Sequence, residues 1–265
     1  MAVADLHQVV RGAGDPTLVF VHGLACSHQD WKAQVEALSS RYRCVSIDLP
    51  GHGASPAKEP LGIACFGAVV AALAREQCGS PGVLVGHSMG CRVVLEAARL
   101  LGDAVAGLVL VDGARRHIGA AAQIRGGTDA RIDAAGFEGF TRRVFSAMFS
   151  DACDSDIRER VLERALKLDP QAGSGLVADM FAWDAGEMED ALDHVQVPLL
   201  LIQSTDPNLR PLRAGQRTPW IDLVSKRVPG AAVEVVPGVG HFTMLEAPEQ
   251  VATLMTRFLA SITPT

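Results

Sequence analysis

Short apolar runs alternate along the chain with longer segments in which apolar residues recur at helical spacing. The short runs are rich in Val, Ile and Leu and lack polar/apolar alternation, which is typical of parallel strands buried on both faces. We predict strands at 17–21, 43–47, 83–85, 107–111, 198–202 and 233–236, and helices at about 30–40, 63–78, 90–101 and 248–262. This order predicts an α/β fold in which a mostly parallel sheet is flanked by helices.

One interval between two late strands interrupts the alternation. It contains no predicted strand, and its patterns are helical at 136–149, 156–168 and 175–183. Ligands of open α/β sheets bind beyond the carboxyl ends of the strands, where an insertion of this kind can cover them. We therefore predict a core formed by residues 1–114 and 194–265, and a helical cap formed by residues 115–193.

A predicted strand runs directly into the sequence Gly86-His87-Ser88-Met89-Gly90, and a predicted helix follows. This is the G-x-S-x-G pattern in the strand–turn–helix context that the motif requires. The turn is so tight that only small residues fit two positions before and after the serine. The sequence therefore predicts that Ser88 is a nucleophile presented at the N-terminus of a helix.

A nucleophilic serine needs two backbone N–H donors that stabilise the oxyanion of the tetrahedral intermediate. The residue after the nucleophile, Met89, is expected to supply one. The first predicted strand ends in His22-Gly23-Leu24, and Leu24 is expected to supply the other. We expect His22 to hold this loop by hydrogen bonds.

The base and its acid partner are expected on loops after the last two strands. His241 lies in a glycine-containing loop after the strand at 233–236, downstream of the serine. Asp206 follows the strand at 198–202 and gives the order Ser, Asp, His along the chain. Asp112, directly after the strand at 107–111, is the alternative acid. We expect the other histidines, including His7 and His28, to be surface, capping or structural residues.

The predicted cap supplies apolar and aromatic residues that could line a substrate pocket. The candidates for substrate binding are Phe140, Phe145, Met148, Phe181, Trp183 and Arg115. Most of the apolar residues are also suited to packing cap helices together. The Arg115 side chain could bind a substrate carboxylate or could lie at a solvated helix start.

Composition narrows the classes of protein that the chain can belong to. Its 265 residues have 48% hydrophobic content and a formal net charge of −6, without a basic cluster of the kind that binds nucleic acid or anionic membranes. Six cysteines lack metal-binding spacing and are expected to be reduced. No signal peptide pattern and no apolar run of about 20 residues is present. We expect a cytoplasmic protein.

Together these motifs resemble the α/β-hydrolase superfamily over essentially the whole chain. The matching stretches are His22-Gly23, residues 30–38, residues 48–55, Gly86 to Gly90, Asp206, Gly240-His241 and Glu246-Ala247-Pro248. The combination is most similar to small bacterial carboxylesterases with a helical cap. One departure is Cys91, where relatives commonly carry glycine.

The resemblance and the residues together lead us to expect a serine carboxylesterase acting on small to medium apolar or aryl esters. Such an enzyme requires no metal and no organic cofactor, and its partner is a small-molecule ester. A C–C bond hydrolase, a lactonase or a low-turnover ligand-sensing protein on the same scaffold remains an alternative. A monomer and a homodimer are both compatible with the sequence.

Overall fold

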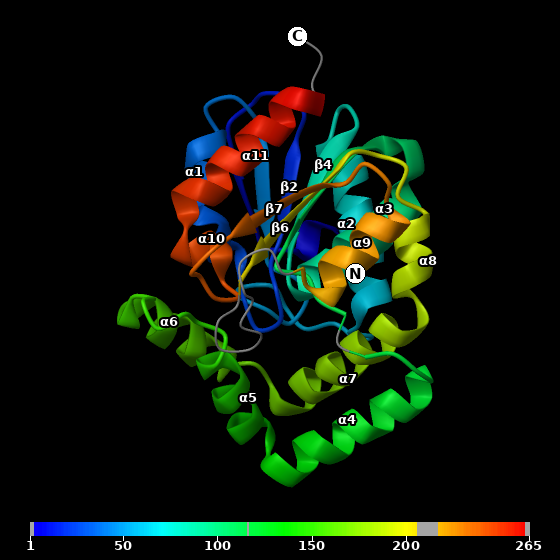
Figure 1. Ribbon diagram of the computed structural model, residues 1–265, viewed down its shortest axis with the longest axis vertical. Coiled ribbons are helices and arrows are strands. Elements are labelled where there is room, and N and C mark those ends of the chain that lie inside the picture. Colours follow the sequence, from blue (N-terminus) through cyan, green and yellow to red (C-terminus); the bar gives the residue numbers. More distant parts are fainter. Residues whose placement is uncertain (1–2, 116, 206–216, 263–265) are drawn as a thin grey trace.

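The computed structural model describes residues 3–115, 117–205 and 217–262, and within these ranges the chain forms a seven-stranded sheet (Figure 1). The strands are β1 (Gln8–Arg11), β2 (Leu18–Val21), β3 (Cys44–Ile47), β4 (Gly82–His87), β5 (Val105–Val111), β6 (Leu199–Ser204) and β7 (Ala232–Val236). Their spatial order is β1-β3-β2-β4-β5-β6-β7. All neighbouring pairs are parallel except β1 with β3. The predicted α/β-hydrolase sheet is therefore confirmed.

The two edges of the sheet differ from the sequence prediction. Strand β1 was not predicted, because it has only four residues, two of which are exposed, and it pairs only with β3. Strand β7 was predicted as buried on both faces, but most of its residues are partly or fully exposed. Strands at a sheet edge lack one neighbour, so their sequences need not be apolar on both faces.

Helices cover both faces of the sheet, as Figure 1 shows. The described helices are α1 (Lys32–Leu38), α2 (Ile63–Gln77), α3 (Met89–Leu101), α4 (Ala121–Ala135), α5 (Phe137–Ser146), α6 (Ser155–Ala165), α7 (Pro170–Gly186), α8 (Met188–Asp193), α9 (Pro219–Arg227), α10 (Thr243–Glu246) and α11 (Pro248–Ile262). Short 3₁₀ helices are η1 (Val3–Asp5), η2 (His28–Trp31) and η3 (Gly102–Ala104).

The core forms two apolar layers that meet the sheet from opposite sides. Val19 and Val21 pack in the layer that contains α2, α3, α8 and α9. Leu18 and Phe20 pack in the layer that contains α1 and α11. Successive side chains of a strand point to opposite faces, so a strand with a helix layer on each side is apolar at most positions.

Helices α4 to α7 lie between β5 and β6 in the chain and form the cap at the lower end of the molecule in Figure 1. Helix α4 was not predicted. Among its described residues, only Thr128 and Ile132 have buried side chains. So few apolar positions give little periodic signal. The exact division into a core of 1–114 and 194–265 and a cap of 115–193 stays a prediction.

Two further observations concern the chain as a whole. All six cysteines are free thiols, in agreement with the sequence prediction. In the part of the chain that the structure describes, no helix has both the length and the apolar character that crossing a membrane requires.

Candidate active site

Ser88 lies at the turn between β4 and α3 in a backbone conformation that L residues rarely adopt, with φ 53° and ψ −111°. A Cβ on Gly86 would lie 2.4 Å from the Gly90 carbonyl oxygen, and one on Gly90 would lie 2.4 Å from the carbonyl oxygen of Val21. Neither position can accept a side chain without moving backbone. The strained turn holds Ser88, partly exposed, at the first residues of α3, where the helix dipole favours negative charge.

His241 lies against Ser88. Its Nε2 is 2.8 Å from Ser88 Oγ, a hydrogen-bond distance for transfer of the hydroxyl proton. The loop that carries His241 is fixed at both sides: His241 donates its N–H to the Met148 carbonyl at 2.6 Å, and Glu246 Oε1 accepts the Gly240 N–H at 3.1 Å. The sequence analysis predicted that both residues lie on loops after strands, and the fold brings their side chains into contact.

His87 packs against His241, with ring centroids 5.0 Å apart. Its Nε2 lies 2.9 Å from the His241 carbonyl oxygen, so this nitrogen donates to it. Burial lowers the pKa of His87 to about 4, and the imidazole is neutral at pH 7. The neutral His87 ring therefore supports the His241 loop without adding charge to the site.

The loop after β2 passes directly over Ser88. A Cβ on Gly23 would lie 2.9 Å from His87 Nδ1 and 3.2 Å from Ser88 Cβ, so glycine allows the close approach. His22 holds the loop from below, with Nδ1 2.7 Å from the Gly23 carbonyl and Nε2 accepting the Leu49 N–H at 3.0 Å. Burial, and next the neighbouring His52, lower the pKa of His22 well below its usual range. The expected structural role of His22 agrees with these bonds.

Asp112, the alternative acid, is fully buried and is bound by groups other than an imidazole. Oδ1 accepts the Ser204 N–H at 2.7 Å and the Gln203 amide at 3.1 Å, and Oδ2 accepts from the N–H and hydroxyl of Thr243. Burial raises its pKa to about 7, although the hydrogen bonds from Thr243 and Ser204 oppose the rise. Asp112 thus ties β6 to the segment after His241. Asp206 lies outside the described residues.

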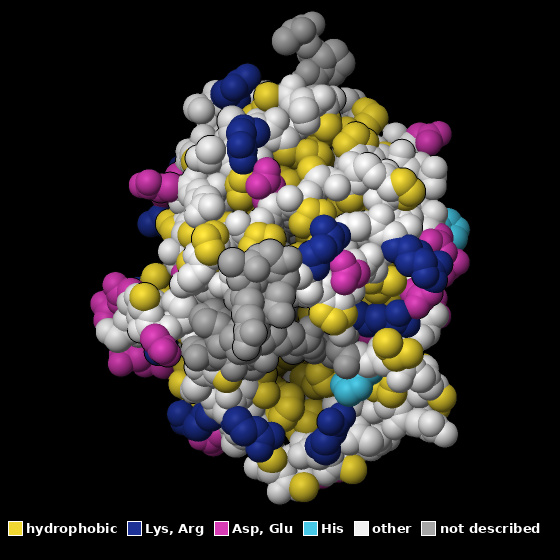
Figure 2. Space-filling view, viewed as in Figure 1, with side chains coloured by type: hydrophobic (Ala, Val, Ile, Leu, Met, Phe, Trp, Pro, Cys, Tyr) yellow, Lys and Arg dark blue, Asp and Glu magenta, His cyan; other side chains and the backbone are white. Residues whose placement is uncertain are grey.

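Ser88 and His241 lie on the wall of a cavity of about 360 Å³ between the core and the cap. Figure 2 shows hydrophobic side chains in the hollow between these parts, with Lys and Arg side chains along its lower rim. Cap residues on the wall include the four predicted residues Phe140, Phe145, Met148 and Phe181, together with Arg143, Val144, Ala147, Val177 and Met180. Leu24 also lies on the wall, as expected for the loop after β2.

Two predicted pocket residues lie elsewhere among the described residues. Trp183 is buried in the apolar layer around α2 and α3, because it is two positions from Phe181 and faces the other side of α7. The Arg115 guanidinium binds Glu189 at 2.5 Å and the Asp184 carbonyl at 3.2 Å, away from the cavity wall.

Arg92 is a site residue that the sequence analysis missed. It extends from α3, four residues after Ser88, and its guanidinium makes a bidentate ion pair with the buried Asp184 of α7, at 2.6 and 2.8 Å. It also donates to the carbonyls of Ser88 and Ala114. A charged residue one helical turn after the predicted nucleophile was the available signal. The pair fixes the cap to the helix that follows the nucleophile.

A second ion pair fixes the other end of the cap. Arg164 of α6 binds both carboxylate oxygens of Asp30 at 2.7 and 2.8 Å and donates to the Ser27 hydroxyl at 3.1 Å. Asp30 and Ser27 belong to the segment that follows the Gly23 loop. The cap is therefore held to both segments that surround Ser88.

Sheet order, strained serine turn and adjacent histidine together define an α/β hydrolase. The model of the Alpha/beta hydrolase family matches residues 18–254, and the chain belongs to this family.

Comparison with individual proteins gives distant relatives over nearly the full length. The chain is similar to the pimeloyl-[acyl-carrier protein] methyl ester esterase of Methylococcus capsulatus, with 27% identity over 264 residues covering 93% of this chain and 95% of that protein. It is also similar to the (E)-2-((N-methylformamido)methylene)succinate hydrolase of Acinetobacter baylyi, with 26% identity covering 96% and 93%. A thermophilic esterase from Thermogutta terrifontis shares the fold, with a TM-score of 0.81, 23% identity and coverage of 97% and 93%.

Proposed function

We propose that the protein is a serine esterase in which Ser88 is the nucleophile, His241 the general base and Asp206 the acid that orients His241. The observation that carries the proposal is the 2.8 Å approach of His241 Nε2 to Ser88 Oγ at an apolar cavity. A nucleophile within hydrogen-bond distance of a base is the arrangement that covalent acyl transfer requires.

In the proposed reaction, His241 takes the hydroxyl proton while Ser88 Oγ attacks the ester carbonyl carbon. The amides of Leu24 and Met89 donate hydrogen bonds to the resulting oxyanion, at the N-terminus of α3. His241 then transfers its proton to the leaving alcohol as the carbonyl reforms. A water molecule, deprotonated by His241, cleaves the acyl-enzyme and releases the acid and Ser88.

The apolar cavity wall favours substrates that carry an apolar acyl group. Phe140, Phe145, Met148 and Phe181 present aromatic and aliphatic surface near Ser88, and burying such surface contributes about 25 cal/mol per Å². The volume of about 360 Å³ suits a group of small to medium size. The relatives from Methylococcus capsulatus and Acinetobacter baylyi are named as an esterase and a hydrolase. This supports ester hydrolysis over a ligand-sensing role.

A series of p-nitrophenyl esters from acetate to octanoate tests the proposal. We expect turnover that rises with acyl length until the chain fills the cavity. The Phe181→Ala variant enlarges the cavity and should move the optimum to a longer acyl chain. Trp183 lies outside the cavity, but it is buried in the core and is therefore unsuitable as a control. Ile118, exposed on the surface, provides the control Ile118→Ala, which should leave the optimum unchanged. Absence of ester turnover, with hydrolysis of a lactone or a C–C bond instead, would reject the esterase assignment.

Gly23→Ala tests the loop over Ser88. The added methyl group would lie 2.9 Å from His87 Nδ1 and 3.2 Å from Ser88 Cβ, so the loop must move away and the Leu24 amide with it. We expect kcat to fall by about 10²–10³-fold, the loss typical of removing one oxyanion donor. Gly126, whose Cβ would meet nothing within 4 Å, gives the control Gly126→Ala. Equal kcat for the Gly23→Ala variant and the wild type would contradict the role of this loop.

A further inference from the structure

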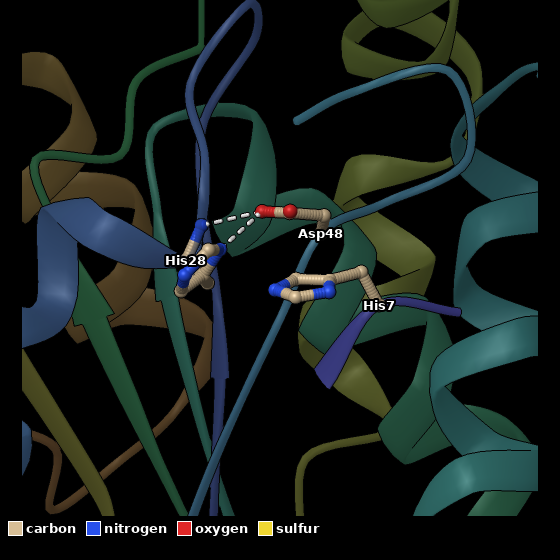
Figure 3. Close-up of side chains that lie close together, drawn as sticks. All are labelled: His7, His28 and Asp48. Atoms are coloured by element: carbon tan, nitrogen blue, oxygen red, sulfur yellow. Dashed lines mark hydrogen bonds and ion pairs between the residues drawn. The ribbon is translucent and has the colours of Figure 1, made fainter. Parts of the chain in front are cut away.

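A second cluster of side chains lies beside the first strand of the sheet. His7 precedes β1, His28 begins η2 and Asp48 follows β3, and one ligand atom from each lies within 4.8 Å of the others. Figure 3 shows the two imidazole rings next to each other and to the carboxylate; the ring centroids are 4.7 Å apart. We propose that this cluster binds a divalent transition-metal ion of the Zn²⁺ type, independently of the Ser88 site.

The ligand set fits Zn²⁺. Two imidazoles and one carboxylate are ligands that Zn²⁺ takes in proteins, with water in the fourth position. Mg²⁺ and Ca²⁺ prefer sites made entirely of oxygen ligands, so two histidines select against them. None of the three residues lies on the wall of the cavity that contains Ser88. The site is therefore separate from the proposed reaction.

The negative charge of the buried Asp48 carboxylate would attract a cation. Its side chain is 1% exposed, and among the described residues its only ion-pair partner is the imidazole of His28. Oδ1 accepts the His28 N–H at 2.7 Å, and Oδ2 accepts the Ala54 N–H at 2.9 Å. These hydrogen bonds stabilise the buried carboxylate in part, and a nearby positive charge would stabilise it further. A divalent ion between Asp48 and the two imidazoles would supply it.

Hydrogen bonds of the backbone hold two of the three segments, those of His7 and Asp48, in place. The His7 N–H donates to the Ser55 hydroxyl at 2.9 Å, and this hydroxyl donates to the Asp48 carbonyl at 2.7 Å. The Asp48 N–H in turn donates to the His7 carbonyl at 3.0 Å. These bonds do not involve the ligand atoms, so the framework of the site exists before any metal binds.

The three side chains would have to move to bind an ion, because their ligand atoms lie within 4.8 Å of one another. Tetrahedral Zn²⁺ with bonds of about 2.0–2.2 Å needs ligand atoms about 3.3 Å apart. His28 Nδ1 and Asp48 Oδ1 are 2.9 Å apart. The ion would replace the hydrogen between them, and the imidazole proton would move from Nδ1 to Nε2. His28 also lines a surface cavity of about 350 Å³ with Val9 and Lys32, which provides a route of entry.

The bound ion would join three segments that are far apart in the sequence. His28 lies four residues after Leu24, in the segment that continues the loop over Ser88. An ion that binds only the folded arrangement stabilises the folded state by mass action. We therefore assign the site a structural role, in which it fastens the segment before β1 to η2 and to the turn after β3.

Calorimetric titration of the untagged chain with ZnCl₂ tests the proposal. We expect one saturable Zn²⁺ per chain and a rise in Tm of about 2–5 °C that EDTA reverses, and no rise with MgCl₂. His7→Ala and His28→Ala should each weaken Zn²⁺ binding by at least about 10-fold. Both variants keep the backbone donors of Asp48. The control is His194→Ala, which removes an exposed histidine 3.5 Å from Asp190 and should leave binding unchanged.

Two measurements exclude other zinc ligands. The His241→Ala variant should bind Zn²⁺ with unchanged affinity, since His241 is outside the cluster. Substitution with Co²⁺ should give no thiolate-to-metal charge-transfer band, which separates this site from the six cysteines. Wild-type affinity in both His7→Ala and His28→Ala, or the lack of any saturable binding, would overturn the proposal.

Discussion

Replacing Ser88 by alanine should lower kcat for a p-nitrophenyl ester by about 10⁶-fold, the loss seen when a serine–histidine pair loses its nucleophile. The Ser88 hydroxyl is the group that His241 Nε2 approaches at 2.8 Å, and the strained turn exists to present it. Without Oγ no acyl-enzyme can form, whatever the state of His241. The alanine fits the turn, because it removes one atom and adds none. The measurement is steady-state turnover on purified, folded protein.

The control for this substitution is Ser80→Ala. Ser80 is exposed on the turn before β4, at the opposite end of the same strand. Its loss should leave kcat within about two-fold, since surface substitutions usually change little. Turnover retained by Ser88→Ala, with Ser80→Ala also active, would mean that another group is the nucleophile.

Replacing Asp206 by asparagine should lower kcat by about 10⁴-fold with little change in Tm. An asparagine in this position favours the wrong imidazole tautomer and cannot stabilise the imidazolium that forms during attack. The prediction rests on the order of residues along the chain and on the hydrogen bonds that already occupy Asp112. Turnover and thermal unfolding of the same preparation give both quantities.

Asp112→Asn is the matched variant, because it makes the same chemical change at the other strand end. Its new NH2 group would replace one carboxylate oxygen and would face either the donors of Ser204 and Gln203 or those of Thr243. Leaving buried groups without acceptors costs about 1–3 kcal/mol, so Tm should fall while kcat falls much less than in Asp206→Asn. The reverse result, a loss of about 10⁴-fold with unchanged Tm in Asp112→Asn, would transfer the role of the acid to Asp112.

The sequence was sufficient for those parts of the fold that depend on neighbouring residues. The central strands are apolar at most positions, because both of their faces are covered. The need for glycine at position 86 is likewise local, because a Cβ there would collide with the Gly90 backbone in the same turn. Gly90 instead avoids the backbone of β2, but the G-x-S-x-G pattern still identifies it. Helix α4 and strand β1 were missed because exposed elements carry little apolar periodicity.

The pocket and the metal cluster depend on contacts between distant segments. Phe181 and Trp183 are two positions apart on α7 and therefore point about 200° apart, so one lines the cavity and the other enters the core. Only the packing of α7 determines which of the two side chains faces the cavity. Arg115 finds Glu189 across 74 positions of sequence. His7, His28 and Asp48 likewise come from three separate segments, and their spacing in the sequence matches no metal-binding motif.

The central claim is that Ser88 becomes acylated during turnover, and mass spectrometry of the intact protein tests it most directly. After a brief reaction with a slowly hydrolysed p-nitrophenyl ester, or with a fluorophosphonate, the protein should gain the mass of one acyl or phosphonyl group. Peptide mapping should locate this group on Ser88, and Ser88→Ala should gain none. Ester turnover by a protein in which Ser88 stays unmodified, or a modification on any other residue that is required for turnover, would contradict the account.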